Sequence, residues 1–103
     1  MKHAFSAALV SMAVFSPAVH AQGADPNLGR NLSAACANCH GTNGAALQGM
    51  PILAGQQKTY LAQQMQDFKA GRRPATIMHQ IAKGYSDEQI EALATYFAAQ
   101  KAR

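Results

Sequence analysis

The chain has 103 residues and a formal net charge of +4. We expect these residues to form one small domain and not two. The basic residues are scattered along the chain, with only Arg72 and Arg73 paired, so no nucleic-acid partner is expected.

The first residues have the pattern of an export signal. Lys2 precedes an apolar stretch, residues 4–15, that is too short to span a bilayer and is followed by small residues. We expect cleavage after Ala21, so that residues 1–21 form a signal peptide and residues 22–103 form the mature domain in the periplasm. The alternative is a retained membrane anchor. No further apolar run is long enough to span a membrane, so no membrane span is expected in the mature chain.

A first helix is predicted over residues 25–40. Asp25 suits the N-cap, Pro26 suits the first helical position, and Gly41 is expected to end the helix. Apolar residues at helical spacing share one of its faces: Leu28, Leu32 and Ala35. The Gly-rich residues 41–51 are predicted to form a loop.

A second helix is predicted over residues 56–70, with Gly71 as its stop. Its apolar residues recur at helical spacing: Leu61, Met65 and Phe68. Pro74 is expected to open a short helical segment that carries Met78, and Gly84 is expected to close it.

The last helix is predicted to begin after Ser86, which forms a capping box with Gln89. Its apolar stripe consists of Ile90, Leu93, Ala94 and Phe97. No segment alternates with period two, so the predicted fold class is all-α, with about four helices. A core of this size is marginal and lacks Trp, so a cofactor is expected to fill the interior.

The motif "CANCH" brings Cys36, Cys39 and His40 into five consecutive residues. The pattern C-x-x-C-H is the attachment signature of a c-type haem. Its spacing lets two thiols add to the two vinyl groups of one porphyrin while the imidazole reaches the iron from the same peptide. We therefore expect Cys36 and Cys39 to anchor one haem c covalently and His40 to be its proximal ligand. The carbonyl of Pro51 is expected to accept a hydrogen bond from the other ring nitrogen of His40.

The motif has three alternative uses. A zinc site needs four ligands, and only His79 remains as a fourth donor. A thioredoxin-like redox pair lies beside a βαβ unit, but no strand is predicted. A Cys36–Cys39 disulfide would close a very short loop and add little stability.

The candidates for the sixth iron ligand are the methionines of the mature chain: Met50, Met65 and Met78. Met65 lies on an apolar helical stripe, which favours core packing. Met78 is the preferred ligand because a helix separates it from His40, leaving enough chain to reach the opposite haem face. Met50 is the second choice, and His79 would give a bis-His iron.

The ordered set "CANCHGTNG", "LAGQ", "DFKAGRR" and "AKGYSDEQIEALATYFAAQ" resembles a class I cytochrome c of the c4/c553 type over about residues 26–100. Within that group, "FKAGRRPATIMHQIAKGYS" is most similar to the monohaem cytochrome subunit of flavocytochrome c sulfide dehydrogenase. The resemblance implies a small class I cytochrome c fold wrapped around one haem, with Met78 as axial ligand. It also implies that Gly29 meets Tyr96 or Phe97 where the first and last helices cross.

The resemblance implies electron transfer through a single haem c, with a flavoprotein subunit or another redox protein as partner. No catalytic residue is predicted, so the chain is expected to be a haem subunit rather than an enzyme in itself. The alternative is a free diffusible carrier that serves an oxidase or another redox enzyme. An enzyme or gas sensor with five-coordinate iron would require that Met78 does not bind.

Overall fold

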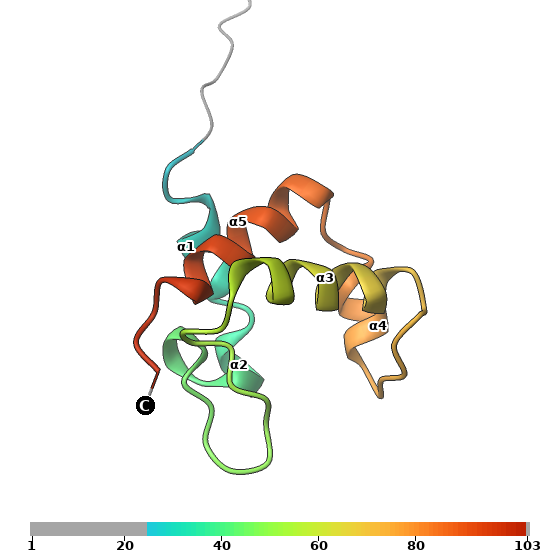
Figure 1. Ribbon diagram of the computed structural model, residues 1–103, viewed down its shortest axis with the longest axis horizontal. Helices are drawn as coiled ribbons and strands as arrows, with labels where there is room; N and C mark the ends of the chain where they lie inside the picture. Colours follow the sequence, from blue (N-terminus) through green and yellow to red (C-terminus); the bar gives the residue numbers. More distant parts are fainter. Residues whose placement is uncertain (1–24, 103) are drawn as a thin grey trace, which may run out of the picture.

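The computed structural model describes residues 25–102, and every regular element in that range is a helix (Figure 1). The elements in chain order are α1 (Leu28–Ser33), α2 (Ala37–His40), the 3₁₀ turn η1 (Thr42–Gly44), α3 (Lys58–Lys69), α4 (Met78–Ala82) and α5 (Asp87–Ala98). The all-α prediction is therefore confirmed. The predicted signal peptide, residues 1–21, lies outside the described residues.

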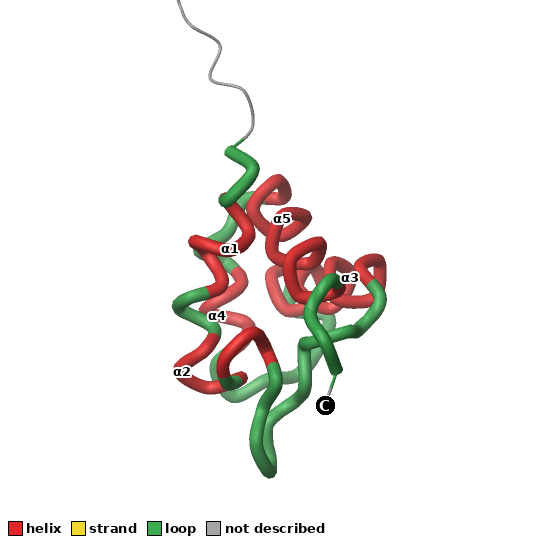
Figure 2. Tube along the Cα trace, turned by 90° about the vertical axis from the view of Figure 1, so that its left-hand side faces the viewer, coloured by secondary structure: helices red, strands yellow, loops and turns green. Residues whose placement is uncertain are grey.

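Helix α5 is the centre of the packing, because both α1 and α3 pack against it, and α4 packs against α3 (Figure 2). The predicted stripe of α5 is buried: Ile90, Leu93, Ala94 and Phe97. These side chains form one apolar core with Leu61 and Ala62 of α3. Within residues 25–102, no helix is long and apolar enough to cross a bilayer.

The two longer helices begin and end close to where the sequence predicts. The Gln89 N–H donates to Ser86 Oγ at 3.1 Å, and the Ser86 N–H donates to Gln89 Oε1 at 2.9 Å, so the capping box at the start of α5 is formed. Helix α3 ends before Gly71, whose φ of +75° few other residues adopt. It begins at Lys58, slightly later than expected.

The single helix predicted over residues 25–40 is wrong in extent, because the structure divides it into α1 and α2. Ser33 Oγ donates to the Arg30 carbonyl at 2.7 Å, and the Cys36 N–H donates to the Ser33 carbonyl at 3.0 Å. These local bonds form a tight turn between the two helices. Ala35 consequently lies on the surface, and the buried face of α1 consists of Gly29 and Ser33.

The expected N-cap of the first helix is also displaced. Asp25 Oδ1 accepts a hydrogen bond from the Asn27 N–H at 2.8 Å, and Asn27 is the residue that precedes α1. Asp25 therefore forms a local side-chain turn before the helix instead of capping it.

The prediction that Pro74 opens the next helix is wrong, since α4 begins only at Met78. Thr76 and Ile77 come between, and both are β-branched residues that favour helices weakly. The first backbone bonds of α4 are accepted by Ile77, at 2.9 Å from Gln80 and 3.1 Å from Ile81.

Gly29 allows α1 to cross α5 at close range. A Cβ atom at Gly29 would lie 2.3 Å from the Ala92 carbonyl oxygen and 3.0 Å from Tyr96 Cβ. The expected contact with Tyr96 is therefore present. Phe97 instead approaches Gly44, where a Cβ atom would lie 2.8 Å from Phe97 Cδ1.

Candidate functional site

The "CANCH" motif forms helix α2 and the turn before it. Cys36 is half-buried and packs against the core, Cys39 is exposed, and His40 is buried, with 8% of its surface exposed. Gly41 ends α2 with a φ of +78°. In the described part of the chain, neither cysteine is in a disulfide.

The ring of His40 is held by one hydrogen bond to the following loop. Its Nδ1 lies 2.8 Å from the carbonyl oxygen of Pro51, the acceptor expected from the sequence. Because a carbonyl can only accept, Nδ1 carries the proton and Nε2 keeps a lone pair for a metal. The loop returns to this position because the Gly44 carbonyl accepts bonds from the backbone N–H groups of Leu53 at 2.9 Å and Ala54 at 3.2 Å.

The environment of Cys36 disfavours its thiolate. Burial raises the pKa of the Cys36 thiol above its ordinary value, and its backbone hydrogen bond only partly offsets this. Burial also raises the pKa of Tyr85, with a smaller contribution from the nearby Cys36 charge. A redox-active thiol pair depends on a lowered pKa, so this environment suits a thioredoxin-like role poorly.

The three candidate methionines occupy different environments. Met65 is half-buried and packs against the core cluster, as core packing predicts. Met78 is half-buried at the start of α4, and Met50 is 41% exposed in the loop after η1. In Figure 1, α2 lies at the left and α4 at the right, both below α3, so His40 and Met78 belong to helices that are separated along the length of α3.

His79 follows Met78 and carries a buried polar atom. Among the described residues, its Nδ1 is the buried side-chain nitrogen or oxygen that lacks a hydrogen-bond partner. Such an atom is costly unless something satisfies it, so it indicates that a polar group belongs near α4.

The donors of this site suit a porphyrin. Within residues 25–102, no group of three or more His, Cys, Asp or Glu side chains is placed to hold a metal ion by itself. The donors present are two free thiols three positions apart and one buried imidazole whose Nδ1 is hydrogen-bonded to a carbonyl. Thiols form thioether bonds to vinyl groups and imidazole binds haem iron, so the residues fit a haem c.

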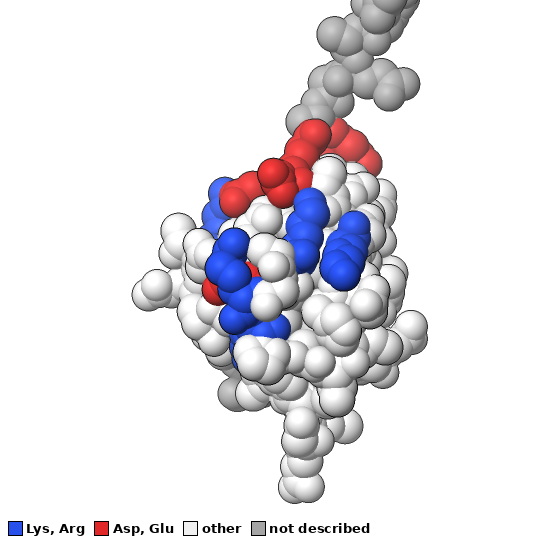
Figure 3. Space-filling view, turned by 90° about the vertical axis from the view of Figure 1, so that its right-hand side faces the viewer, with Lys and Arg blue, Asp and Glu red and all other residues white. Residues whose placement is uncertain are grey.

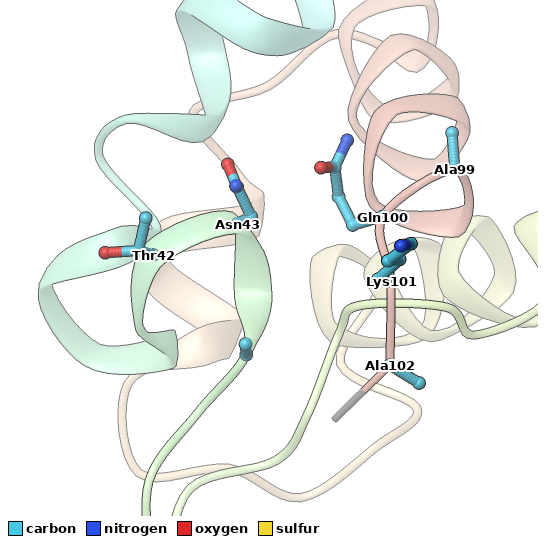
Figure 4. A pocket seen from close by; sticks show the side chains of 7 residues that line it. Thr42, Asn43, Ala99, Gln100, Lys101 and Ala102 are labelled. Atoms are coloured by element: carbon cyan, nitrogen blue, oxygen red, sulfur yellow. The ribbon is translucent and has the colours of Figure 1, made fainter.

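A separate surface pocket lies between η1 and the end of the described chain (Figure 4). Its lining comes from two segments: Thr42, Asn43 and Ala45, then Ala99, Gln100, Lys101 and Ala102. Beside it, Tyr96 Oη donates to Asn43 Oδ1 at 2.6 Å, and Asn43 has a φ of +55°. The sequence does not predict this contact; its signal there is an Asn in a Gly-rich stretch, because Asn tolerates this conformation.

Known proteins resemble this chain over most of its length. A family model described as Cytochrome c matches residues 27–101. The cytochrome subunit of sulfide dehydrogenase from Chlorobaculum tepidum is 42% identical over 69 residues, which are 67% of this chain and 63% of that protein. Cytochrome c4 from Azotobacter vinelandii is 39% identical over 92 residues, covering 80% of this chain and 43% of that protein.

A solved structure of a cytochrome c4 also resembles this chain. The crystal structure of reduced recombinant cytochrome c4 from Pseudomonas stutzeri aligns with a TM-score of 0.63 at 33% sequence identity, covering 75% of this chain and 50% of that one. The chain therefore spans less than two thirds of each of these relatives. The matches confirm the resemblance that the motifs indicated and the class I cytochrome c fold.

Proposed function

This chain belongs to the cytochrome c family, transfers electrons and carries one covalently bound haem c. From this premise we propose which residues hold the haem and which protein exchanges electrons with it. Our proposal is that it is the periplasmic haem subunit that accepts electrons from a flavoprotein sulfide dehydrogenase.

Cys36 and Cys39 are the covalent anchors in this proposal. Each thiol would hold the haem by a thioether to one vinyl group, with sulfur on one vinyl carbon and the thiol hydrogen on the other. The raised pKa of the Cys36 thiol favours its protonated form before attachment. The tight turn before α2 and the α-helical turn of α2 set the spacing of the two sulfur atoms.

His40 and Met78 are the proposed axial ligands. The observation that carries this proposal is the 2.8 Å contact between His40 Nδ1 and the Pro51 carbonyl, because it directs the lone pair of Nε2 away from the loop. Met78 would supply the thioether sulfur, which favours ferrous iron and raises the reduction potential. When bound, the haem iron supplies one-electron chemistry by alternating between its ferric and ferrous states.

Electron transfer of this kind requires no acid, base or nucleophile from the chain. We therefore propose that the chain is a carrier subunit and not an enzyme in itself. Export to the periplasm follows from the proposed signal peptide over residues 1–21, since haem is attached to such chains outside the cytoplasm.

The proposed partner is a sulfide dehydrogenase because the similar protein from Chlorobaculum tepidum is named its cytochrome subunit. That the partner carries flavin is what the resemblance of residues 68–86 to flavocytochrome c implies. The alternative is a free carrier that donates to an oxidase or another redox enzyme. It is supported by the match to cytochrome c4, which covers 80% of this chain.

Reconstitution with a flavoprotein separates the two functions. The haem-loaded chain, mixed with the flavoprotein subunit of a sulfide dehydrogenase and sulfide, should be reduced at a rate that rises with flavoprotein concentration and should co-elute with that subunit. The control is the same mixture without flavoprotein. A chain that remains ferric in the complete mixture, or elutes alone while reducing a terminal oxidase, would favour the free carrier.

A further inference from the structure

The chain contains one Asn–Gly pair, Asn43 and Gly44, which lies in the 3₁₀ turn η1. Such a pair is chemically labile, because glycine has no side chain to keep its backbone nitrogen from the asparagine amide. The Gly44 nitrogen would bond to Asn43 Cγ, and the Cγ–Nδ2 bond would break with release of ammonia. Water would then open the five-membered imide to aspartate or isoaspartate, so amide and water become acid and ammonia.

The backbone of η1 favours this pair in spite of its lability. Asn43 has a φ of +55°, which Gly, Asn and Asp adopt more readily than other residues. Gly44 has a φ of +74°, and a Cβ atom there would lie 2.8 Å from both Leu53 Cβ and Phe97 Cδ1. Few other residues suit either position, so the fold retains a labile peptide bond in the turn that follows the haem-attachment motif.

Two hydrogen bonds restrain the groups that would react. The Gly44 N–H donates to the Gly41 carbonyl at 3.0 Å, so the attacking nitrogen keeps its proton. Tyr96 Oη donates to Asn43 Oδ1 at 2.6 Å, across the space where η1 lies opposite the end of α5 (Figure 4). The Tyr96 ring is half-buried and packs against the core, so it cannot follow the amide when the Asn43 side chain rotates.

A reaction at Asn43 would disturb the proposed haem site. The turn η1 connects His40 to Gly44, whose carbonyl closes the loop that carries Pro51, the hydrogen-bond acceptor of His40. Isoaspartate would lengthen the backbone of this turn, and either product would add a negative charge to residues 31–57, which contain no Asp, Glu, Lys or Arg. Charged side chains gather instead on the face formed by α4 and the end of α3, shown in Figure 3.

We propose that Asn43–Gly44 is a latent deamidation site, which the hydrogen bond from the Tyr96 hydroxyl keeps closed. The proposal is independent of the partner with which the chain exchanges electrons. The amide must leave Tyr96 before the Gly44 nitrogen can reach Cγ, so the rate follows the population in which this contact is open. Loss of the hydroxyl should raise that population, and with it the rate, about tenfold.

Isoaspartate formation in the haem-loaded full chain at mildly alkaline pH tests the proposal. Labelling by an isoaspartyl methyltransferase and the mass of tryptic peptide 31–58 report the conversion. Tyr96→Phe should form isoaspartate about tenfold faster than the wild-type chain. Tyr60→Phe, at an exposed position on α3, is the matched control and should keep the wild-type rate. Adding Asn43→Gly to Tyr96→Phe should remove the signal, which assigns it to residue 43.

A core variant separates this local effect from general loss of stability. Ile90→Val shortens a fully buried side chain near the other end of α5 and should leave the rate unchanged. An equal increase in Ile90→Val and Tyr96→Phe would overturn the proposal, because global unfolding would then admit the reaction. An unchanged or slower rate in Tyr96→Phe would also overturn it, the slower rate showing that the hydroxyl promotes attack by polarising the amide. Wild-type chain that reacts as fast as chain unfolded in urea would show that the fold gives no protection.

Discussion

Within residues 25–102, one side-chain hydrogen bond holds the ring of His40, and this bond determines which ring nitrogen can bind iron. The ring is buried, and the 2.8 Å contact to the Pro51 carbonyl fixes the proton on Nδ1. The bond also ties the motif to the loop that follows it, so ligand orientation and loop position depend on each other.

The sixth ligand is tested by truncating the proposed methionine. Met78→Ala should abolish the methionine–iron absorption band of the ferric protein and lower the reduction potential, because a thioether stabilises ferrous iron. Optical spectra and redox titration report both quantities.

Met50→Ala provides the matched control for that change. It removes a methionine that is 41% exposed and should keep both the band and the potential. A band that survives in Met78→Ala but disappears in Met50→Ala would contradict the assignment.

At the residue scale, the sequence predicts contacts that depend on local spacing better than those that depend on tertiary geometry. Pro51 could be proposed as the acceptor for His40 from its position in the loop that follows the motif. The bond from Tyr96 to Asn43 could not, because it requires the end of α5 to lie beside η1. Its geometry depends on the packing of the whole chain.

The helices are positioned by a few close contacts. Gly29 brings α1 against Ala92 of α5, and the capping box at Ser86 sets where α5 begins. At its far end, the Phe97 carbonyl accepts from the Gly55 N–H at 2.9 Å, which joins α5 to the chain just before α3. Helix α5 is thus fixed at both ends around the apolar stripe that forms the core.

Gly29→Ala tests the helix crossing. Its new methyl group would lie 2.3 Å from the Ala92 carbonyl oxygen, so the helices must move apart, and unfolding free energy should fall by about 1–3 kcal/mol. Denaturant unfolding of the haem-loaded protein measures this loss.

Gly84→Ala is the control because its nearest contact, the Ile81 carbonyl oxygen, would be 3.3 Å away. The change should alter stability by no more than about 0.5 kcal/mol, as surface substitutions usually do. Equal unfolding free energies of the two variants would show that α1 and α5 tolerate a methyl group at their crossing.

The contact between α3 and the start of α5 predicts an acid-dependent effect. The Gln66 amide, followed by Lys69, hydrogen-bonds to Asp87 and holds the pKa of its carboxyl below the ordinary value of 3.8. Because the folded-state pKa is the lower one, this stabilisation is present above pH 3.8 and is lost as pH falls through the folded pKa. Asp87→Asn should therefore lower the melting temperature at neutral pH, by an amount that shrinks progressively below pH 3.8.

Glu88→Gln, in the same helical turn, leaves the contacts of Asp87 intact and should keep the wild-type acid dependence of melting. If the deficit of Asp87→Asn stays constant from neutral to acid pH, Asp87 contributes nothing through its charge.

At the element scale, the sequence predicts helices where periodicity and caps agree and misplaces boundaries where local bonds compete. The stripe of α5 and its capping box are examples of agreement. The break after Ser33 arises from a side-chain bond to the Arg30 carbonyl, which apolar periodicity does not report. Helix α4 begins later than predicted because Thr76 and Ile77, which favour helices weakly, lie between Pro74 and Met78.

Across the whole molecule, the charged residues and the proposed haem-binding motif lie in different segments of the chain. The segment of residues 31–57 holds the motif, η1 and the loop that follows η1 without a charged residue, whereas α3 and α5 carry the ion pairs. This separation leaves the proposed haem site bordered by uncharged surface. It also explains why the small net charge of the chain says little about its partner.

The proposed function depends on covalent attachment of one haem to Cys36 and Cys39 in an exported protein. The intact mass of chain recovered from the periplasm tests it most directly, with thiol alkylation as part of the same measurement. The mass should equal that of residues 22–103 plus one porphyrin with its iron, and neither Cys36 nor Cys39 should react. A colourless chain with the mass of the bare polypeptide, its cysteines alkylated or joined to each other, would contradict the account.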